Sequence, residues 1–269
     1  MRSFGRLFAS ELRLMLGKRR NIAGLLVLAA LPILLAVGVY TNGGNDGSGL
    51  FGLIRGSGLI VALAALTVSV TVFLPLAIAM VCGDSIAGEA QQGTLRYLLA
   101  VPVGRTRLLF AKFAALAVGA VIATSVISLS GAVIGGVLFG ADGMMTFSGT
   151  RLDVWSALGR LVLATLYVSA GLIALAAVGL FLSTLTEQPI AAMVMVMVLV
   201  AAMWIVNGLE ELAFLHPWLL VRDWTSFVDL LRVPVMWDGM LRGLAVDAAY
   251  ALVFLSAAWA HFTSKDVTS

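Results

Sequence analysis

Polar residues recur at helical spacing in one segment of this otherwise apolar sequence. Ser85, Glu89, Gln92 and Arg96 fall at i, i+4, i+7 and i+11, on one face of a helix. A carboxylate and a guanidinium on such a face can make charge-assisted hydrogen bonds to another protein. The pattern predicts a short amphipathic helix that ends by Pro102 and is bound by a partner outside the membrane.

Residues that could support catalysis or metal binding are sparse elsewhere. Cys82 is the only cysteine, and His216 and His261 are far apart without an acidic cluster at ligand spacing. The sequence contains neither a G-x-S-x-G elbow nor a G-x-x-x-x-G-K-S/T loop. We therefore expect no metal site, no cofactor in this chain, no enzyme activity of its own and no ATP binding in the P-loop manner.

The composition is that of an integral membrane protein. Of the 269 residues, 61% are hydrophobic and 12% are charged, whereas a soluble domain carries about 25% charged residues. Apolar runs approach the roughly 20 residues that a helix needs to span a bilayer, and strand-like alternation is absent. The basic pI of 9.4 indicates arginines and lysines beside anionic headgroups rather than a nucleic-acid surface.

The apolar runs predict an all-α polytopic membrane protein with six transmembrane helices in a single domain, 1–269. Residues 1–20 predict an amphipathic helix at the membrane interface, and 207–242, with three tryptophans, predicts short extracellular helices or an interfacial segment. The expected spans are about 21–40, 58–82, 113–140, 157–182, 188–206 and 243–262.

The distribution of charge orients these spans. With the N-terminus inside, the cytoplasmic segments hold 11 of the 17 basic residues and the outer segments hold 6. Cytoplasmic loops are enriched in Lys and Arg, so we expect both termini in the cytoplasm. The span centres are nearly free of ionisable residues, which argues against a proton-coupled transporter. Hydroxyls in the third span are candidates to line a pathway.

The segment from Asp84 to Arg105 carries a family resemblance. Its pattern D-x-I-A-x-E-x-x-x-G-T-L-R-x-L-L-x-x-P-V-x-R resembles the signature loop of type-2 ABC exporter permeases, whose fold is shared with the G-subfamily transporters. The N-terminal helix, the six spans and the long segment before the last span fit the same family. The resemblance covers most of the chain.

This resemblance implies that 83–107 is a cytoplasmic coupling loop whose helix, roughly 84–99, docks on a separate ATP-binding subunit that holds ATP and Mg. It further implies that Glu89 pairs with basic residues of the N-terminal helix. The implied coupling residues are Asp84, Ser85, Glu89, Gln92, Gly93, Thr94, Arg96, Pro102 and Arg105. The implied contacts of the N-terminal helix are Glu11, Arg13, Lys18, Arg19 and Arg20.

The expected function is that of the permease subunit of an ATP-driven exporter in a prokaryotic plasma membrane. It would act as a dimer of two copies or with a paralogue, in contact with membrane lipids. The expected cargo is a drug, a lipid or a peptide antibiotic. The alternatives are a sulfur or metal-maturation cargo, and a secondary transporter without an ATPase.

Overall fold

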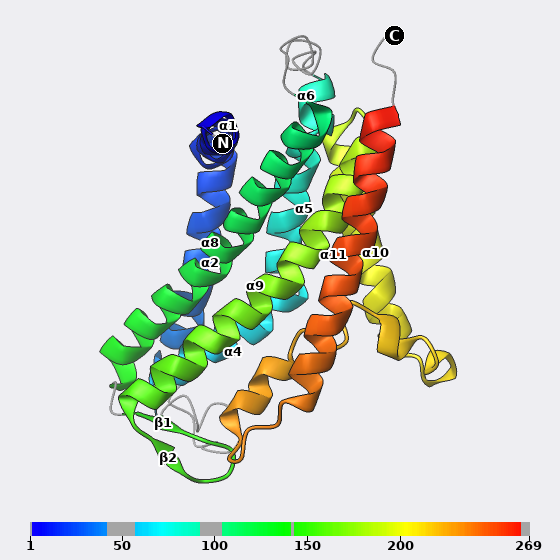
Figure 1. Cartoon of the computed structure of the whole chain (residues 1–269). Coiled ribbons are helices and arrows are strands. Elements are labelled where there is room, and N and C mark those ends of the chain that lie inside the picture. Colours follow the sequence, from blue (N-terminus) through cyan, green and yellow to red (C-terminus); the bar gives the residue numbers. More distant parts are fainter. Residues whose placement is uncertain (1, 42–56, 92–103, 141–142, 265–269) are drawn as a thin grey trace.

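The structure is a computed structural model that describes residues 2–41, 57–91, 104–140 and 143–264. It consists of long helices that run side by side, with a shorter helix across one end and a small two-stranded ladder at the other (Figure 1). The elements in chain order are α1 (Arg2–Gly17), α2 (Arg19–Thr41), α4 (Leu59–Thr71), α5 (Phe73–Ser85), α6 (Ala87–Gln91), α8 (Arg105–Phe139), β1 (Met144–Met145), β2 (Arg151–Leu152), α9 (Val154–Leu185), α10 (Pro189–Asn207), η1 (Glu210–Leu212), η2 (His216–Trp218), η3 (Ser226–Leu231) and α11 (Asp238–Ser264).

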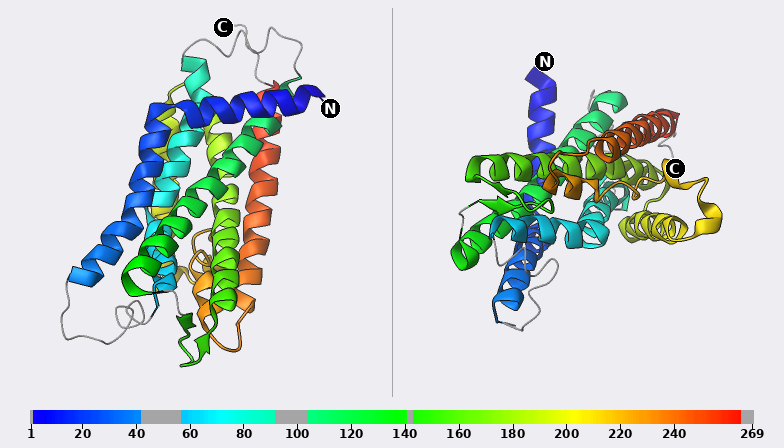
Figure 2. Two further views of the ribbon diagram at one scale, coloured as in Figure 1. Left: turned by 90° about the vertical axis from the view of Figure 1, so that its left-hand side faces the viewer. Right: turned by 90° about the horizontal axis from the view of Figure 1, so that it is seen from below.

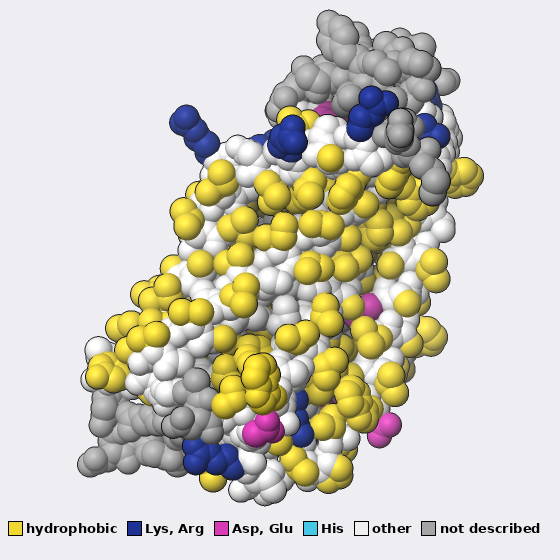
Figure 3. All heavy atoms as spheres, turned by 60° about the vertical axis from the view of Figure 1, so that its left-hand side comes forward, with side chains coloured by type: hydrophobic (Ala, Val, Ile, Leu, Met, Phe, Trp, Pro, Cys, Tyr) yellow, Lys and Arg dark blue, Asp and Glu magenta, His cyan; other side chains and the backbone are white. Residues whose placement is uncertain are grey.

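Among the residues that the structure describes, up to six apolar segments are long enough to cross a membrane. Five are single helices, namely α2, α8, α9, α10 and α11, and the sixth is the pair α4 and α5. Apolar side chains cover the middle of the molecule in a broad belt (Figure 3), as expected of helices that face lipid. The prediction of a multi-pass helical membrane protein is confirmed.

The second span is bent, which the sequence pattern did not predict. α4 and α5 meet at an angle of 54° around Val72, whose backbone is not helical. Pro75 lies in the first turn of α5, and a proline ring clashes with the carbonyl four residues earlier, here that of Thr71. A continuous helix through this point is therefore disfavoured.

α1 lies across the end of the bundle that also holds α6 and the last turns of α11 (Figure 2, left). Its first described residue and Ser264, at the end of α11, are thus at the same end of the molecule. The amphipathic helix expected over 1–20 is present as α1, whose polar and apolar residues lie on different faces. Two ends on one side agree with an even number of crossings.

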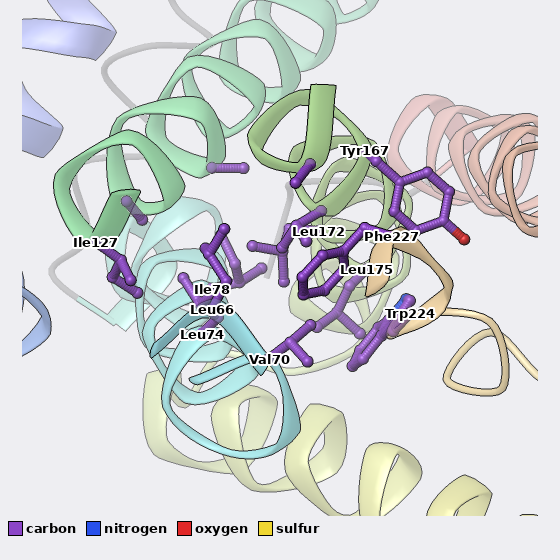
Figure 4. Close-up of a cluster of buried hydrophobic side chains, with 14 of the residues drawn as sticks. Leu66, Val70, Leu74, Ile78, Ile127, Tyr167, Leu172, Leu175, Trp224 and Phe227 are labelled. Atoms are coloured by element: carbon purple, nitrogen blue, oxygen red, sulfur yellow. The ribbon is translucent and has the colours of Figure 1, made fainter. Parts of the chain in front are cut away.

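α9 is the central helix and packs against α4, α5, α8, α10 and α11. Leu172 and Leu175 of α9 meet Leu66 and Leu74 of the bent pair in the core (Figure 4). α4 packs on α8 through small residues: the position where a Cβ of Gly135 would lie is blocked by the carbonyl oxygen of Gly58. Gly131 and Gly135 of α8 thus allow α4 and α8 to approach closely.

Three local features of the structure were not expected from the sequence. α8 begins at Arg105, eight residues before the predicted start at 113, because its charged first turns extend past the apolar part of the helix. The segment between α8 and α9 contains the antiparallel pair β1–β2. Each strand has only two residues, too few to produce an alternation of polar and apolar residues in the sequence. Short helices were expected in 207–242 and are present as 3-10 helices, and Trp224 of this segment is buried in the core.

Candidate functional site

The polar stripe predicted from the sequence begins where the second span ends. Asp84 and Ser85 form the last turn of α5, and Glu89 is in α6. The helix predicted over 84–99 is therefore interrupted at Ile86, between α5 and α6. The remaining residues of the stripe and its flank, Gln92, Gly93, Thr94, Arg96 and Pro102, lie outside the described residues.

The joint between α5 and α6 is held by the neighbouring α9 and α10. The buried hydroxyl of Ser183, near the end of α9, accepts hydrogen bonds from the backbone N–H groups of Ile86 (3.2 Å) and Ala87 (3.0 Å). These bonds satisfy donors that a helix start leaves open. Gly83 lies against the carbonyl of Pro189, where a Cβ would come within 2.5 Å of that oxygen. The joint is thus fixed to the core of the bundle.

Lys112 is the centre of the charge cluster. Its Nζ lies 2.5 Å from Glu89 Oε1 in α6 and 3.0 Å from Glu11 Oε2 in α1, and its side chain is only 1% exposed. One ammonium group therefore ties α1, α6 and α8 together. Burial raises the pKa of the Glu89 carboxyl above its ordinary value, and the neighbouring Lys112 opposes this rise.

Asp84 forms the second ionic contact with the N-terminal region. Lys18 Nζ lies 3.2 Å from Asp84 Oδ2, and the Arg20 guanidinium contacts the same carboxylate oxygen. The ion pairs are divided between the two carboxylates: Lys18 and Arg20 contact Asp84, whereas Glu89 contacts Lys112 and is also under the electrostatic influence of Lys18. Glu89 is one turn beyond the joint, where it faces α8 instead.

The other predicted contact residues have different surroundings. Glu11 is in the cluster, whereas Arg13 and Arg19 are exposed. Arg105 donates a hydrogen bond of 2.9 Å to the carbonyl of Thr263 at the end of α11, a favourable position for a cation at a helix C-terminus. Arg105 therefore starts α8 and holds α11 instead of lying in a loop.

A hollow of about 440 Å³ opens beside the cluster, between α1 and the ends of α5 and α8. Three carboxylates and two lysines border it, together with Asn21 and apolar residues of α1 and α8. The central position of Lys112 and the presence of Asn21 at this site were not predictable from the sequence pattern. The signal for Lys112 was present, as a lone lysine at the start of an apolar run.

Buried polar side chains also lie within the spans, as hydroxyls between α8 and α9 and as a carboxyl group in α11. Thr124 and Ser128 of α8 meet Ser169 and Thr165 of α9 at 2.6 and 2.7 Å, buried between the helices. These two hydroxyls are thus used in helix packing and do not line an open path in this chain. Asp247 of α11 is an ionisable group with only 6% exposure, which was not expected in a span.

At the other end of the bundle, the Asp223 carboxylate holds the Arg242 guanidinium through two contacts of 3.0 and 2.8 Å. The Tyr167 hydroxyl donates to the Asp223 carbonyl at 2.6 Å. Tyr167, Trp224 and Phe227 lie together there (Figure 4). These contacts fix the segment after α10 to α9 and α11.

Comparison with known proteins decides what kind of protein has this site. A family model described as "ABC-2 family transporter protein" matches residues 15–203. The chain belongs to the ABC-2 transporter family. A relative in Stutzerimonas stutzeri, named "Probable ABC transporter permease protein NosY", is 34% identical over 156 residues, which cover 55% of this chain and 53% of that protein. The chain thus matches about half of the length of this relative.

These matches make the chain an ABC-2 type permease, the membrane component of an ABC transporter. Such a component lacks an ATPase domain of its own, which fits the absence of a P-loop from this sequence. The family model includes α2 through most of α10 and thus the whole α5–α6 joint and Lys112.

Proposed function

We propose that this permease subunit is coupled to a separate ATP-binding subunit at the end of the bundle that holds α1 and α6. The observation that carries the proposal is the position of Lys112, which ties Glu89 of α6 to Glu11 of α1 and to α8. A partner that moves α6 would therefore move α1 and α8 as well. Asp84, Ser85, Glu89 and Arg105, with Gln92, Gly93, Thr94, Arg96 and Pro102 of the following segment, are the proposed coupling residues.

The contacts at the α5–α6 joint favour transmission of a movement of α6 to the rest of the bundle over bending of α6 alone. Ser183 and Pro189 fix the start of α6 to the core, so a force on α6 reaches α9 and α10. Packed helices respond by rigid-body shifts between discrete arrangements. ATP and Mg, bound by the partner, would drive these shifts, and two permease copies, or this chain with a paralogue, would enclose the path of the cargo.

The direction of transport is proposed to be export from the cytoplasm, with a drug, a lipid or a peptide antibiotic as cargo. A sulfur or metal-maturation cargo is the alternative for the same subunit. A secondary transporter is the other alternative, and it predicts transport that persists when the partner is replaced by a variant unable to hydrolyse ATP. ATP-driven export predicts that this replacement abolishes transport.

The coupling role is tested by Glu89→Gln, which removes the charge with little change in size. We expect the stimulation of the partner's ATP hydrolysis to fall about tenfold, within the usual range of coupling free energies. Asp229→Asn is the matched control, because Asp229 pairs with Arg232 at the opposite end of the bundle. Stimulation and transport both unchanged in Glu89→Gln would overturn the role of Glu89.

The proposed orientation has both termini in the cytoplasm of a prokaryotic cell. In a Cys82→Ala background, Ser48→Cys is expected to react with a membrane-impermeant maleimide in intact cells. Gln91→Cys, which is exposed at the end of α6, is expected to react only after the cells are opened. The opposite labelling pattern would contradict this orientation.

A further inference from the structure

α11 is held by side-chain contacts at both of its ends. At the end of the bundle that α1 crosses, the Arg105 guanidinium donates to the carbonyl of Thr263 at 2.9 Å. One turn earlier on α11, Trp259 Nε1 donates to Thr106 Oγ1 at 3.0 Å. Arg105 and Thr106 are the first two residues of α8, and Lys112 lies two turns further along the same helix. The charge cluster and this end of α11 are therefore both attached to the start of α8.

At the opposite end of the bundle, α11 holds the segment 218–231, which contains η3. The Arg242 guanidinium makes two contacts with the Asp223 carboxylate. Two turns further along α11, the Tyr250 hydroxyl donates to the carbonyl of Trp218 at 2.9 Å. η3 packs against both α9 and α11, and Figure 1 shows it beside the lower part of α11. α11 thus joins the start of α8 to a segment at the far end of the bundle.

α11 is suited to move as one body. It is a single helix of 27 residues without a proline, so it is about 40 Å long at 1.5 Å per residue. Its packing is mainly against α9, and Leu241, Leu252 and Val253 on its other sides are exposed. A helix that packs along one side can slide over its neighbour as a rigid body, because few contacts have to be broken.

The contact between α11 and segment 218–231 leaves a donor and an acceptor of the described residues unpaired. Trp224 Nε1 is buried with no hydrogen-bond partner. The Asp247 carboxylate, in a residue that is 6% exposed, has the like-charged Asp223 as its electrostatic neighbour. Trp224 Nε1 and Asp247 Oδ1 lie 2.8 and 3.7 Å from the point where a Cβ of Gly171 would be. A buried donor without a partner costs free energy, so a shift of α11 that pairs the two groups is favoured by this contact.

We infer that α11 carries a movement of α8 to the segment 218–231, and that Thr106, Trp259 and Arg242 are its connecting residues. A partner that moves α6 moves α8 through Lys112, and the first turn of α8 then moves α11. The inference rests on the proposed function for the force that acts on α6. The connection along α11 is a property of this chain alone.

The connection is tested on the purified full-length chain by hydrogen–deuterium exchange with mass spectrometry. Thr106→Val combined with Trp259→Phe removes the hydrogen bond at one end of α11. We expect amide exchange in 218–231, at the other end, to become about fivefold faster, which is the lower end of usual coupling free energies. Val253→Ala, at an exposed position of α11, is the control and is expected to change nothing. Unchanged exchange in 218–231 would overturn the inference, as would an equal rise in α4, which would show general loosening.

The route is tested by removing the contacts at the other end of α11. Arg242→Lys combined with Tyr250→Phe removes the two-point contact and the hydrogen bond that hold 218–231. In this background, we expect Thr106→Val with Trp259→Phe to change exchange in 218–231 less than about twofold, as for sites that do not interact. A fivefold change in both backgrounds would overturn the role of α11. Neither measurement contains the ATP-binding subunit, so failure of this inference is distinct from failure of the coupling that Glu89→Gln tests.

Discussion

Replacement of Lys112 by methionine is expected to lower the free energy of unfolding by about 3–5 kcal/mol, the usual cost of removing one partner from a buried ion pair. Methionine fills a similar volume but leaves the carboxylates of Glu11 and Glu89 close together without the ammonium group that lies between them. Their side chains are 11% and 19% exposed, so water screens them poorly. The loss is measured by unfolding in mixed micelles with increasing fractions of denaturing detergent.

Lys18→Met is the matched control for this experiment. Lys18 pairs with Asp84 but is 42% exposed, so its removal is expected to cost less than about 1 kcal/mol. The triple variant Glu11→Gln, Glu89→Gln and Lys112→Met carries no charge at the cluster and is expected to regain most of the lost stability. A cost below about 1 kcal/mol for Lys112→Met alone would contradict a buried charge at the centre of this site.

Replacement of Gly135 by alanine is expected to lower the free energy of unfolding by about 1–3 kcal/mol or more, as overpacking does in a close interface. The new methyl group would meet the backbone of Gly58, which cannot rotate away as a side chain can. α4 and α8 would have to separate, and the second span would shift with them. Thermal unfolding in detergent measures this change.

Gly159→Ala on α9 is the control for that substitution, because nothing lies within 4 Å of its added Cβ. Alanine is a better helix former than glycine by about 1 kcal/mol, so this variant is expected to be as stable as the wild type or slightly more so. Equal effects of the two substitutions would show that α4 and α8 are not in close contact at Gly135.

The spans were predictable because an apolar run of about 20 residues is long enough to cross a bilayer as a helix. The bend at Val72 was harder to predict. Pro75 marks a place where a helix can break, but Pro32 lies within α2, which is not broken. Which proline bends its helix depends on the neighbours that pack there, and a local pattern does not contain them. The early start of α8 escaped prediction because Arg105 and Arg107 have the composition of a loop.

The residues of the candidate site were predictable as a group, but their pairing was not. The spacing of Ser85 and Glu89 along one segment indicated a polar helical face, and the family resemblance implied that this face lies near the N-terminal helix. The break at Ile86 then turns α6, so that Asp84 meets Lys18 and Arg20 while Glu89 meets Lys112. That turn depends on Ser183, which is nearly 100 positions away in the chain. The segment 92–103 lies outside the described residues, and its coupling role stays a prediction.

The most direct test of the proposed function is a photo-crosslink from the end of α6 to the ATP-binding subunit. Gln91→Cys, in the Cys82→Ala background, is labelled with a maleimide photo-crosslinker in membranes that contain the partner. We expect an adduct with the ATP-binding subunit from Gln91→Cys and none from Phe147→Cys, which is exposed between β1 and β2 at the opposite end. An adduct from Phe147→Cys, or none from Gln91→Cys, would contradict docking of the ATPase at the α6 end.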